Sequence, residues 1–73
     1  MPKLGTFSGS EVCQILATEG FAPVRQRGSH IIMQRKHAGQ STTVPVPNHR
    51  AIRIGTLQAI IRQSGVAKTK FLR

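Results

Sequence analysis

The stretch that decides the fold is FAPVRQRGSHIIMQRKHAGQSTTVPV, residues 21–46 of a 73-residue chain. Valine, isoleucine and threonine recur along it, as they do in strands. Small and turn-forming residues interrupt it at Gly28-Ser29 and again at Ala38-Gly39-Gln40, where the chain can close hairpins. The stretch therefore predicts an antiparallel meander. Its three strands are expected at residues 21–27, 30–36 and 41–46.

Helical patterns flank this stretch on both sides. Before it, apolar residues three and four apart follow a serine that can act as N-cap. This pattern predicts a helix over about residues 8–19, ended by Gly20. After the strands, Thr56 is the expected N-cap of a second helix that ends at Gly65. The tail over residues 66–73 is expected to add one more helical turn.

These elements predict an α+β fold of order α-β-β-β-α with two layers, in which both helices cover one face of a three-stranded antiparallel sheet. Pro45 and Pro47 cannot donate to the hydrogen bonds of a sheet, so we expect the third strand at an edge. A chain of this length has room for one domain. We expect that domain to span residues 1–73, with an ordered core over about 8–72.

Strand alternation leaves the inward face of the middle strand open. His30, Ile32 and Gln34 share one side, while Ile31, Met33 and Arg35 share the other. Because apolar residues stand on both sides, alternation alone does not identify the side under the helices. We favour Ile32 inward, which would hold His30 at the rim of the core.

Positive charge dominates the second part of the chain. The formal net charge is +9 and the sequence pI is about 11.9. Residues 1–24 carry a net charge of −1, whereas residues 25–73 carry +10 and no acidic residue. Such a field attracts polyanions, and most of the cations are arginines, which can grip a phosphate with two hydrogen bonds. A nucleic acid is therefore the expected partner.

Several classes of location and chemistry can be excluded. No apolar run suits a membrane helix or a secretory signal, and the lone Cys13 cannot form an internal disulfide. We therefore expect a cytoplasmic protein with no membrane partner. Two glutamates, no aspartate, and one cysteine with three scattered histidines cannot supply a two-metal nuclease site, a zinc site or a Ser-His-Asp triad. We expect no metal and no cofactor.

Histidine acid–base chemistry on RNA survives these exclusions. RNA carries its own nucleophile, the 2′-hydroxyl, which a neutral imidazole can deprotonate while fixed cations stabilise the phosphorane. His30 is the best candidate because it follows Gly28 and Ser29, whose small side chains let a phosphate approach. We also expect Arg25, Arg27 and Arg35 to flank it in space. The structural alternative is a histidine that only closes a hydrogen bond at the start of a strand.

A further set of residues carries a resemblance to a known family. The set comprises Gly9, Gly20-Phe21, Arg25-Gln26-Arg27-Gly28-Ser29-His30, Val44-Pro45-Val46, Gly55-Thr56-Leu57, Ile60-Ile61 and Gly65. In these elements the chain closely resembles the HicA family of mRNA-interferase toxins from bacterial and archaeal toxin–antitoxin systems. The resemblance implies a double-stranded-RNA-binding-domain-like fold, metal-independent ribonuclease activity, and a HicB antitoxin that covers the active site. It places the family's catalytic histidine on His30 and the preceding glycine on Gly28.

The leading hypothesis is an endoribonuclease toxin that cleaves mRNA with His30 as general base and is inhibited by a HicB-like antitoxin. The residues expected to bind RNA are Arg25, Arg27, Gly28, Ser29, Arg35 and Arg53. A non-catalytic RNA-binding module, or a degenerate relative of such toxins, explains the charge equally well. A third role, as a subunit of an autoregulatory complex, would bring the protein to DNA only indirectly, through the antitoxin complex.

Overall fold

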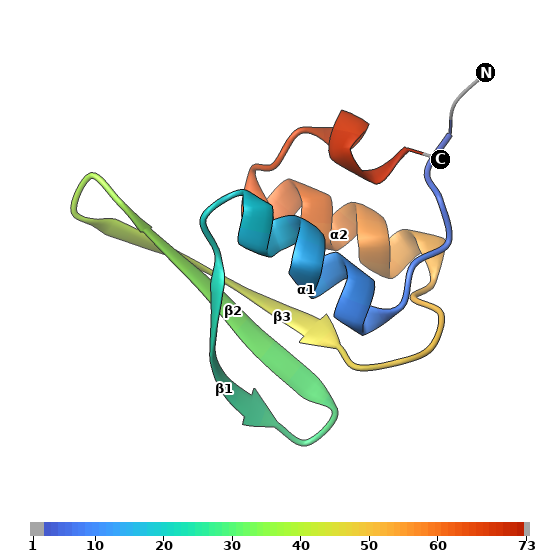
Figure 1. Ribbon diagram of the computed structural model, residues 1–73, viewed down its shortest axis with the longest axis horizontal. Coiled ribbons are helices and arrows are strands. Elements are labelled where there is room, and N and C mark those ends of the chain that lie inside the picture. Colours follow the sequence, from blue (N-terminus) through green and yellow to red (C-terminus); the bar gives the residue numbers. More distant parts are fainter. Residues whose placement is uncertain (1–2, 73) are drawn as a thin grey trace.

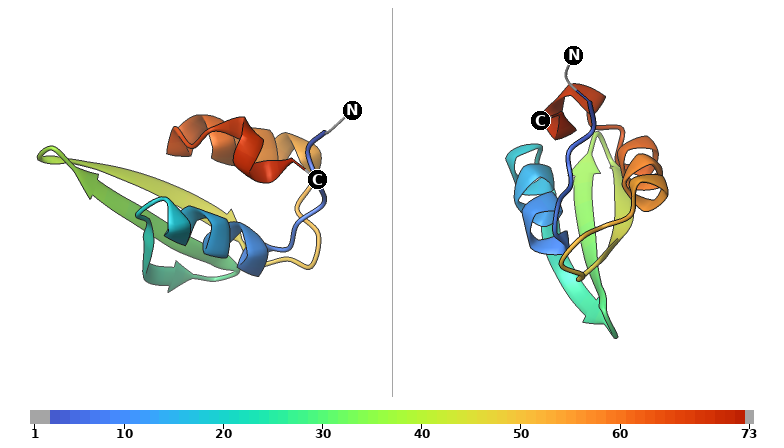
Figure 2. Two further views of the ribbon diagram at one scale, coloured as in Figure 1. Left: turned by 45° about the horizontal axis from the view of Figure 1, so that its top comes forward. Right: turned by 90° about the vertical axis from the view of Figure 1, so that its right-hand side faces the viewer.

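The elements follow one another as the sequence predicts (Figure 1). A computed structural model describes residues 3–72. In chain order the elements are α1 (Gly9–Thr18), β1 (Ala22–Arg27), β2 (His30–His37), β3 (Gln40–Pro47), α2 (Ile54–Ser64) and a short 3-10 helix, η1 (Lys68–Phe71). Both long helices lie on the same side of the sheet (Figure 2), which confirms the predicted two-layer α+β fold. No helix within residues 3–72 has the length and apolar character to cross a membrane.

The sheet is an antiparallel meander of order β1-β2-β3. The turn residues Ala38 and Gly39 both have positive φ, a conformation that suits tight two-residue hairpins. β3 lies at an edge, as its prolines predict. β1, the other edge strand, contains Pro23 and an irregularity between Pro23 and Arg25. Prolines and irregularities make both edges poor templates for pairing with another strand.

The two helices begin differently. Ser8 caps α1 in a capping box, because its side chain accepts a hydrogen bond from the Glu11 N–H while the Glu11 carboxylate accepts one from the Ser8 N–H. α2 begins at Ile54, so the expectation that Thr56 is its N-cap is wrong. The start is set just upstream, where the buried Ile52 donates its N–H to the Phe7 carbonyl oxygen at 2.8 Å. Helix α2 ends at the left-handed Gly65, as predicted.

The core fills the space between the helices and the sheet. Phe7 and Phe71 meet edge to face, with ring centroids 5.9 Å apart, and close the core where the two ends of the chain run side by side. The remaining core residues come from both helices, the sheet and the connections, namely Val12, Leu16, Phe21, Met33, Val44, Val46, Ile52, Leu57, Ile60 and Val66. One apolar cluster therefore holds all the elements together.

The middle strand faces the opposite way from our expectation. Met33, only 1% exposed, joins the core beside its cross-strand partner Val44. Residues paired across antiparallel strands share a face, so the buried valines of β3 draw Met33 under the helices. Ile32 consequently points to the helix-free side, and His30 lies there too, exposed rather than at the rim of the core.

Candidate nucleic-acid interface

The face of the sheet that the helices leave uncovered carries most of the predicted site. We call it the open face and define it by the strand register. Its first row, Arg27, His30 and Pro47, is followed by the rows Arg25, Ile32 and Pro45; Ala22, Gln34 and Thr43; and finally Lys36 and Ser41. A hydrogen bond of 3.2 Å from Gln34 Nε2 to Thr43 Oγ1 shows directly that side chains of one row stand together.

His30 occupies the first row, immediately after the β1–β2 turn. It pairs with Arg27 on one side and with Pro47 on the other, and its side chain is exposed. Directly opposite residues have Cβ atoms about 5 Å apart, and diagonal neighbours about 7 Å apart. The guanidinium groups of Arg27 and, one row further, Arg25 can therefore reach the same anion as the His30 imidazole. The structure brings these three predicted residues together.

The turn before His30 is held firmly but left open on its outer side. The side-chain amide of Gln26 donates through Nε2 to the Gly28 carbonyl oxygen at 3.3 Å. The backbone N–H of Asn48 donates to the Ser29 carbonyl oxygen at 2.6 Å. Gly28 has a φ of +58°, and a Cβ there would meet nothing within 4 Å. A ligand can thus approach the backbone at Gly28 and Ser29. Sequence reasoning missed the anchoring role of Asn48, which depends on a backbone contact that no sequence pattern shows.

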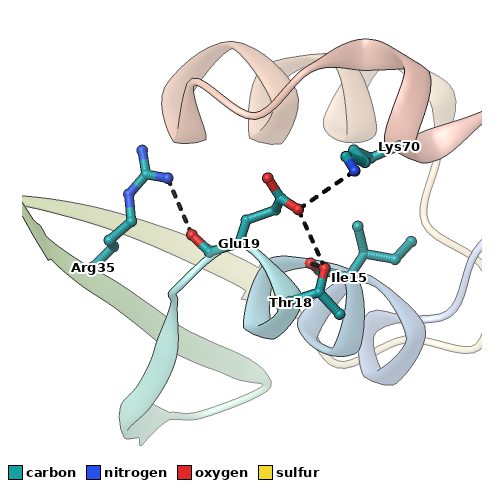
Figure 3. Close-up of polar contacts among 5 residues, drawn as sticks. All are labelled: Ile15, Thr18, Glu19, Arg35 and Lys70. Atoms are coloured by element: carbon teal, nitrogen blue, oxygen red, sulfur yellow. Dashed lines mark hydrogen bonds and ion pairs between the residues drawn. The ribbon is translucent and has the colours of Figure 1, made fainter.

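Arg35 lies on the other side of the sheet and does not join His30. Its guanidinium donates to the Glu19 carbonyl oxygen at 3.1 Å (Figure 3). It also donates to the Ser64 carbonyl oxygen at 3.3 Å and lies 4.8 Å from the ring centroid of Phe21. The carbonyl oxygens belong to the C-terminal ends of α1 and α2, where a positive charge is favourable. Arg35 therefore does not lie beside His30, where we expected it. Its contacts tie both helices to the sheet.

Both acidic side chains of the protein, Glu11 and Glu19, are on the helix side of the molecule. Glu19 caps the end of α1, and its carboxylate lies 3.7 Å from Lys70 Nζ (Figure 3). Glu11 belongs to the capping box at the start of the same helix. Because the chain contains no other acidic residue, no carboxylate within residues 3–72 lies beside the cations of the open face. This face is therefore the strongest candidate for holding a polyanion.

Arg53 is outside the four rows of the open face. It is exposed and occupies the N-cap position of α2, after the connection that follows β3. The structure therefore does not pair it with His30 across the sheet. Its guanidinium adds positive charge on the side of the molecule where the chain leaves β3.

A hollow of the surface lies between α1 and β1. It has a volume of about 710 Å³ and is lined by Cys13, Ala17, Ile31 and other residues, among them Arg25 at its border with the sheet, but not by His30. Burial raises the pKa of the Cys13 thiol, so this cysteine is a poor nucleophile. Within residues 3–72, no three His, Cys, Asp or Glu side chains gather into a group that could hold a metal ion. A long polymer fits an exposed sheet face better than this hollow.

Comparison with known proteins adds one finding. Residues 9–66 match the family model described as HicA toxin of bacterial toxin-antitoxin. No curated protein and no solved structure matches the chain. The matched residues include α1, the whole sheet and α2, so every element that positions His30 falls within the match. The chain therefore belongs to the HicA family of toxins of bacterial toxin–antitoxin systems.

Proposed function

We propose that the protein is a metal-independent endoribonuclease that cleaves mRNA on the open face, with His30 as general base. One observation carries the proposal. His30 is exposed on a helix-free sheet face, directly across from Arg27, and neither glutamate of the chain lies on that face. This arrangement offers a base and fixed cations to the same phosphodiester.

The proposed reaction uses the RNA's own hydroxyl. An imidazole nitrogen of His30 accepts the proton of the 2′-hydroxyl, and the 2′-oxygen forms a bond to phosphorus. The bond between phosphorus and the 5′-oxygen breaks, and the departing oxygen takes a proton from water. The products are a 2′,3′-cyclic phosphate and a 5′-hydroxyl. A positioned base of this kind contributes a factor of about 10² to 10⁴ in rate.

The surroundings of His30 support the charge changes in this step. The guanidinium groups of Arg25 and Arg27 can hold the phosphate oxygens, on which negative charge accumulates in the phosphorane. Gly28 and Ser29 leave their backbone accessible, so the phosphate can come close to the turn. We assign Arg53 a supporting role, in which its exposed side chain attracts the RNA backbone beyond the scissile position.

A toxin of this family has an antitoxin as its partner. We propose a HicB-like antitoxin that inhibits by covering the open face and bringing carboxylates to Arg25 and Arg27. Those carboxylates would supply the negative charge that this face lacks. Any contact with DNA would then go through the antitoxin complex.

The test is an RNA cleavage assay in EDTA with matched histidine variants. The wild-type protein and His37→Ala should cleave, because His37 lies at the far end of β2. His30→Ala should lose about 10²- to 10⁴-fold in rate while its circular dichroism spectrum and unfolding midpoint stay the same. A substrate with one 2′-deoxyribose at the scissile nucleotide should remain intact at that position.

Two results would overturn the proposal. Undiminished cleavage by folded His30→Ala would remove His30 from the reaction. Tight RNA binding by the wild-type protein without any cleavage would instead identify a non-catalytic RNA-binding module.

A further inference from the structure

The hollow between α1 and β1 has largely apolar walls. Cys13 and Ala17 line it from α1, Val24 from β1 and Ile31 from β2. Within residues 3–72 the sheet has no strand beyond β1, so the hollow opens at the edge of the sheet. Its volume of about 710 Å³ has room for a large apolar side chain.

Val24 extends the apolar surface of this hollow outward. The strand register has an irregularity between Pro23 and Arg25, so Val24 has no residue opposite it on β2, and such an irregularity re-aims the side chain. Val24 is 50% exposed, and the other large apolar side chain that residues 3–72 leave exposed is Ile54. A single exposed valine is ordinary, but one that continues an apolar hollow makes a patch of the kind that marks protein interfaces.

Arg25 gives the border of the hollow a positive charge. It lines the hollow and also belongs to the second row of the open face, opposite Ile32. Neither Glu11 nor Glu19 lines the hollow, and the whole chain has a net charge of +9. A complementary partner therefore combines an apolar side chain with a carboxylate beside it.

The hollow shares residues with the support of His30. Asn48 lines it and donates its backbone N–H to the Ser29 carbonyl oxygen at 2.6 Å, in the turn before His30. Ile31, another lining residue, directly follows His30 in β2. A partner seated in the hollow needs to pass only the width of β1 to reach the open face.

A protein suits this hollow better than RNA does. Arg25 is the only charged residue among those that line it, and most of the others are apolar or small, so its walls offer little to a phosphate backbone. An apolar side chain that fills a pocket is, in contrast, the usual anchor of a protein interface. The family of this chain is one of toxins from toxin–antitoxin systems, so an antitoxin is the protein that the hollow is expected to meet.

We propose that the antitoxin anchors itself in the hollow between α1 and β1, with an apolar side chain against Val24 and Cys13 and a carboxylate on Arg25. The inference rests on the proposed function, in which the antitoxin covers the open face. It places an anchor of the inhibitor at the edge of the sheet, outside the surface that handles RNA.

The test measures binding of the HicB-like protein encoded beside the toxin's gene, by isothermal titration calorimetry. Val24→Ser removes the apolar rim, and Ala17→Phe fills the hollow from an exposed position of α1. Each should weaken binding by about tenfold or more, while RNA cleavage without the antitoxin stays at the wild-type rate. Ile54→Ser and Gln63→Phe make the same changes at exposed positions of α2 and should keep the wild-type affinity.

A second measurement uses the wild-type protein and therefore does not depend on how the variants fold. Cys13 is the only cysteine of the chain and lines the hollow, so its alkylation by N-ethylmaleimide reports whether the hollow is filled. A saturating amount of the HicB-like protein should nearly abolish the alkylation. An uncleavable 2′-O-methyl RNA should leave its rate unchanged.

Three results would overturn the anchor. Wild-type affinity in folded Val24→Ser and Ala17→Phe, or alkylation of Cys13 at the free rate in the complex, would remove it and leave the ribonuclease and its antitoxin in place. Protection of Cys13 by RNA, with slower cleavage by Ala17→Phe, would assign the hollow to RNA. A wild-type protein that cleaves RNA but does not bind the HicB-like protein would overturn the antitoxin partnership and, with it, the anchor. Loss of the ribonuclease proposal alone, through a wild-type protein that cleaves no RNA, would leave the affinities to decide the anchor.

Discussion

Arg27 and Arg35 are the same residue type on neighbouring strands, yet they stand on opposite faces of the sheet and have different environments. Arg35 is half-buried, and its guanidinium contacts the C-terminal ends of both helices and the ring of Phe21. Arg27 is exposed opposite His30. The strand alternation decides which arginine stabilises the fold and which is free to meet a ligand.

The same division holds for charge. The helix-covered side contains both glutamates, each engaged with backbone or basic groups, whereas the open face carries cations without a carboxylate beside them. Arg25, Arg27 and Lys36 therefore stand without an acidic side chain beside them where RNA is proposed to bind. Substitutions on the helix-covered side should therefore change stability, whereas substitutions on the open face should change RNA binding and cleavage.

The largest stability effect is expected at Arg35. Arg35→Ala removes two charge-assisted hydrogen bonds and a cation–π contact, so the free energy of unfolding should fall by about 3 kcal/mol, measured by urea unfolding. Cleavage per folded molecule should not change. Lys36→Ala, the neighbouring cation on the open face, is the control and should leave stability nearly unaltered. Weaker RNA binding by Arg35→Ala at unchanged stability would contradict the assignment of Arg35 to the covered face.

Gly9 tests the contact that connects the two sides. A Cβ at Gly9 would lie 2.1 Å from the Pro47 carbonyl oxygen, so Gly9→Ala should push α1 away from the end of β3. Overpacking of this kind costs about 2 kcal/mol. Asn48, next in the chain, anchors the turn before His30, so we expect reduced cleavage as well as a lower unfolding midpoint.

The matched control for Gly9 is Gly55, near the start of α2. A Cβ at Gly55 would meet nothing within 4 Å, and alanine favours a helix over glycine. Gly55→Ala should therefore keep or raise stability. Equal stability of the two alanine variants would show that the close approach at Gly9 is unimportant.

Arg27 should show the reverse of Arg35. Arg27→Ala should weaken RNA binding about tenfold and lower the slope of log affinity against log salt by about 1, with little change in unfolding. Arg62→Ala, an exposed charge on α2, removes the same charge from the helix side. If both variants lose the same affinity, the net charge of the protein, and not the open face, governs binding.

The smallest effect is expected at the capping box of α1. Ser8→Ala removes the side-chain acceptor for the Glu11 N–H and should cost about 1 kcal/mol of stability, with cleavage unchanged. Ser10→Ala, two residues further on at an exposed position, is the control for the loss of a serine. A loss of activity in folded Ser8→Ala would show that the two sides are more tightly coupled than the contacts indicate.

Most of the fold could be predicted because local signals agree with the tertiary structure. The alternation of β-branched residues, the glycine turns and the prolines of β3 place the strands correctly. Two features could not be predicted locally. The inward face of β2 depends on its register with Val44 and Val46, and the start of α2 depends on the anchoring of Ile52 by Phe7.

The candidate site was predictable to the same extent. Arg25, Arg27 and His30 lie near one another in the sequence across a two-residue turn, so a hairpin brings them together. Arg35 is grouped with them when only its charge is considered and the face of β2 on which it lies is left out. Arg35 stands two residues after Met33 on the same strand and therefore shares its face. Because Met33 is buried under the helices, Arg35 lies on the side opposite His30.

The central claim is that RNA lies on the open face, and methyl NMR tests it most directly. Ile32 and Thr43 carry methyl groups on that face, while their chain neighbours Met33 and Val44 carry theirs in the core. On titration with an uncleavable 2′-O-methyl RNA, the Ile32 and Thr43 methyl signals and the His30 ring signals should shift, and those of Met33 and Val44 should change little. Shifts confined to methyl groups of α1 and α2, with Ile32 and Thr43 unmoved, would contradict the account.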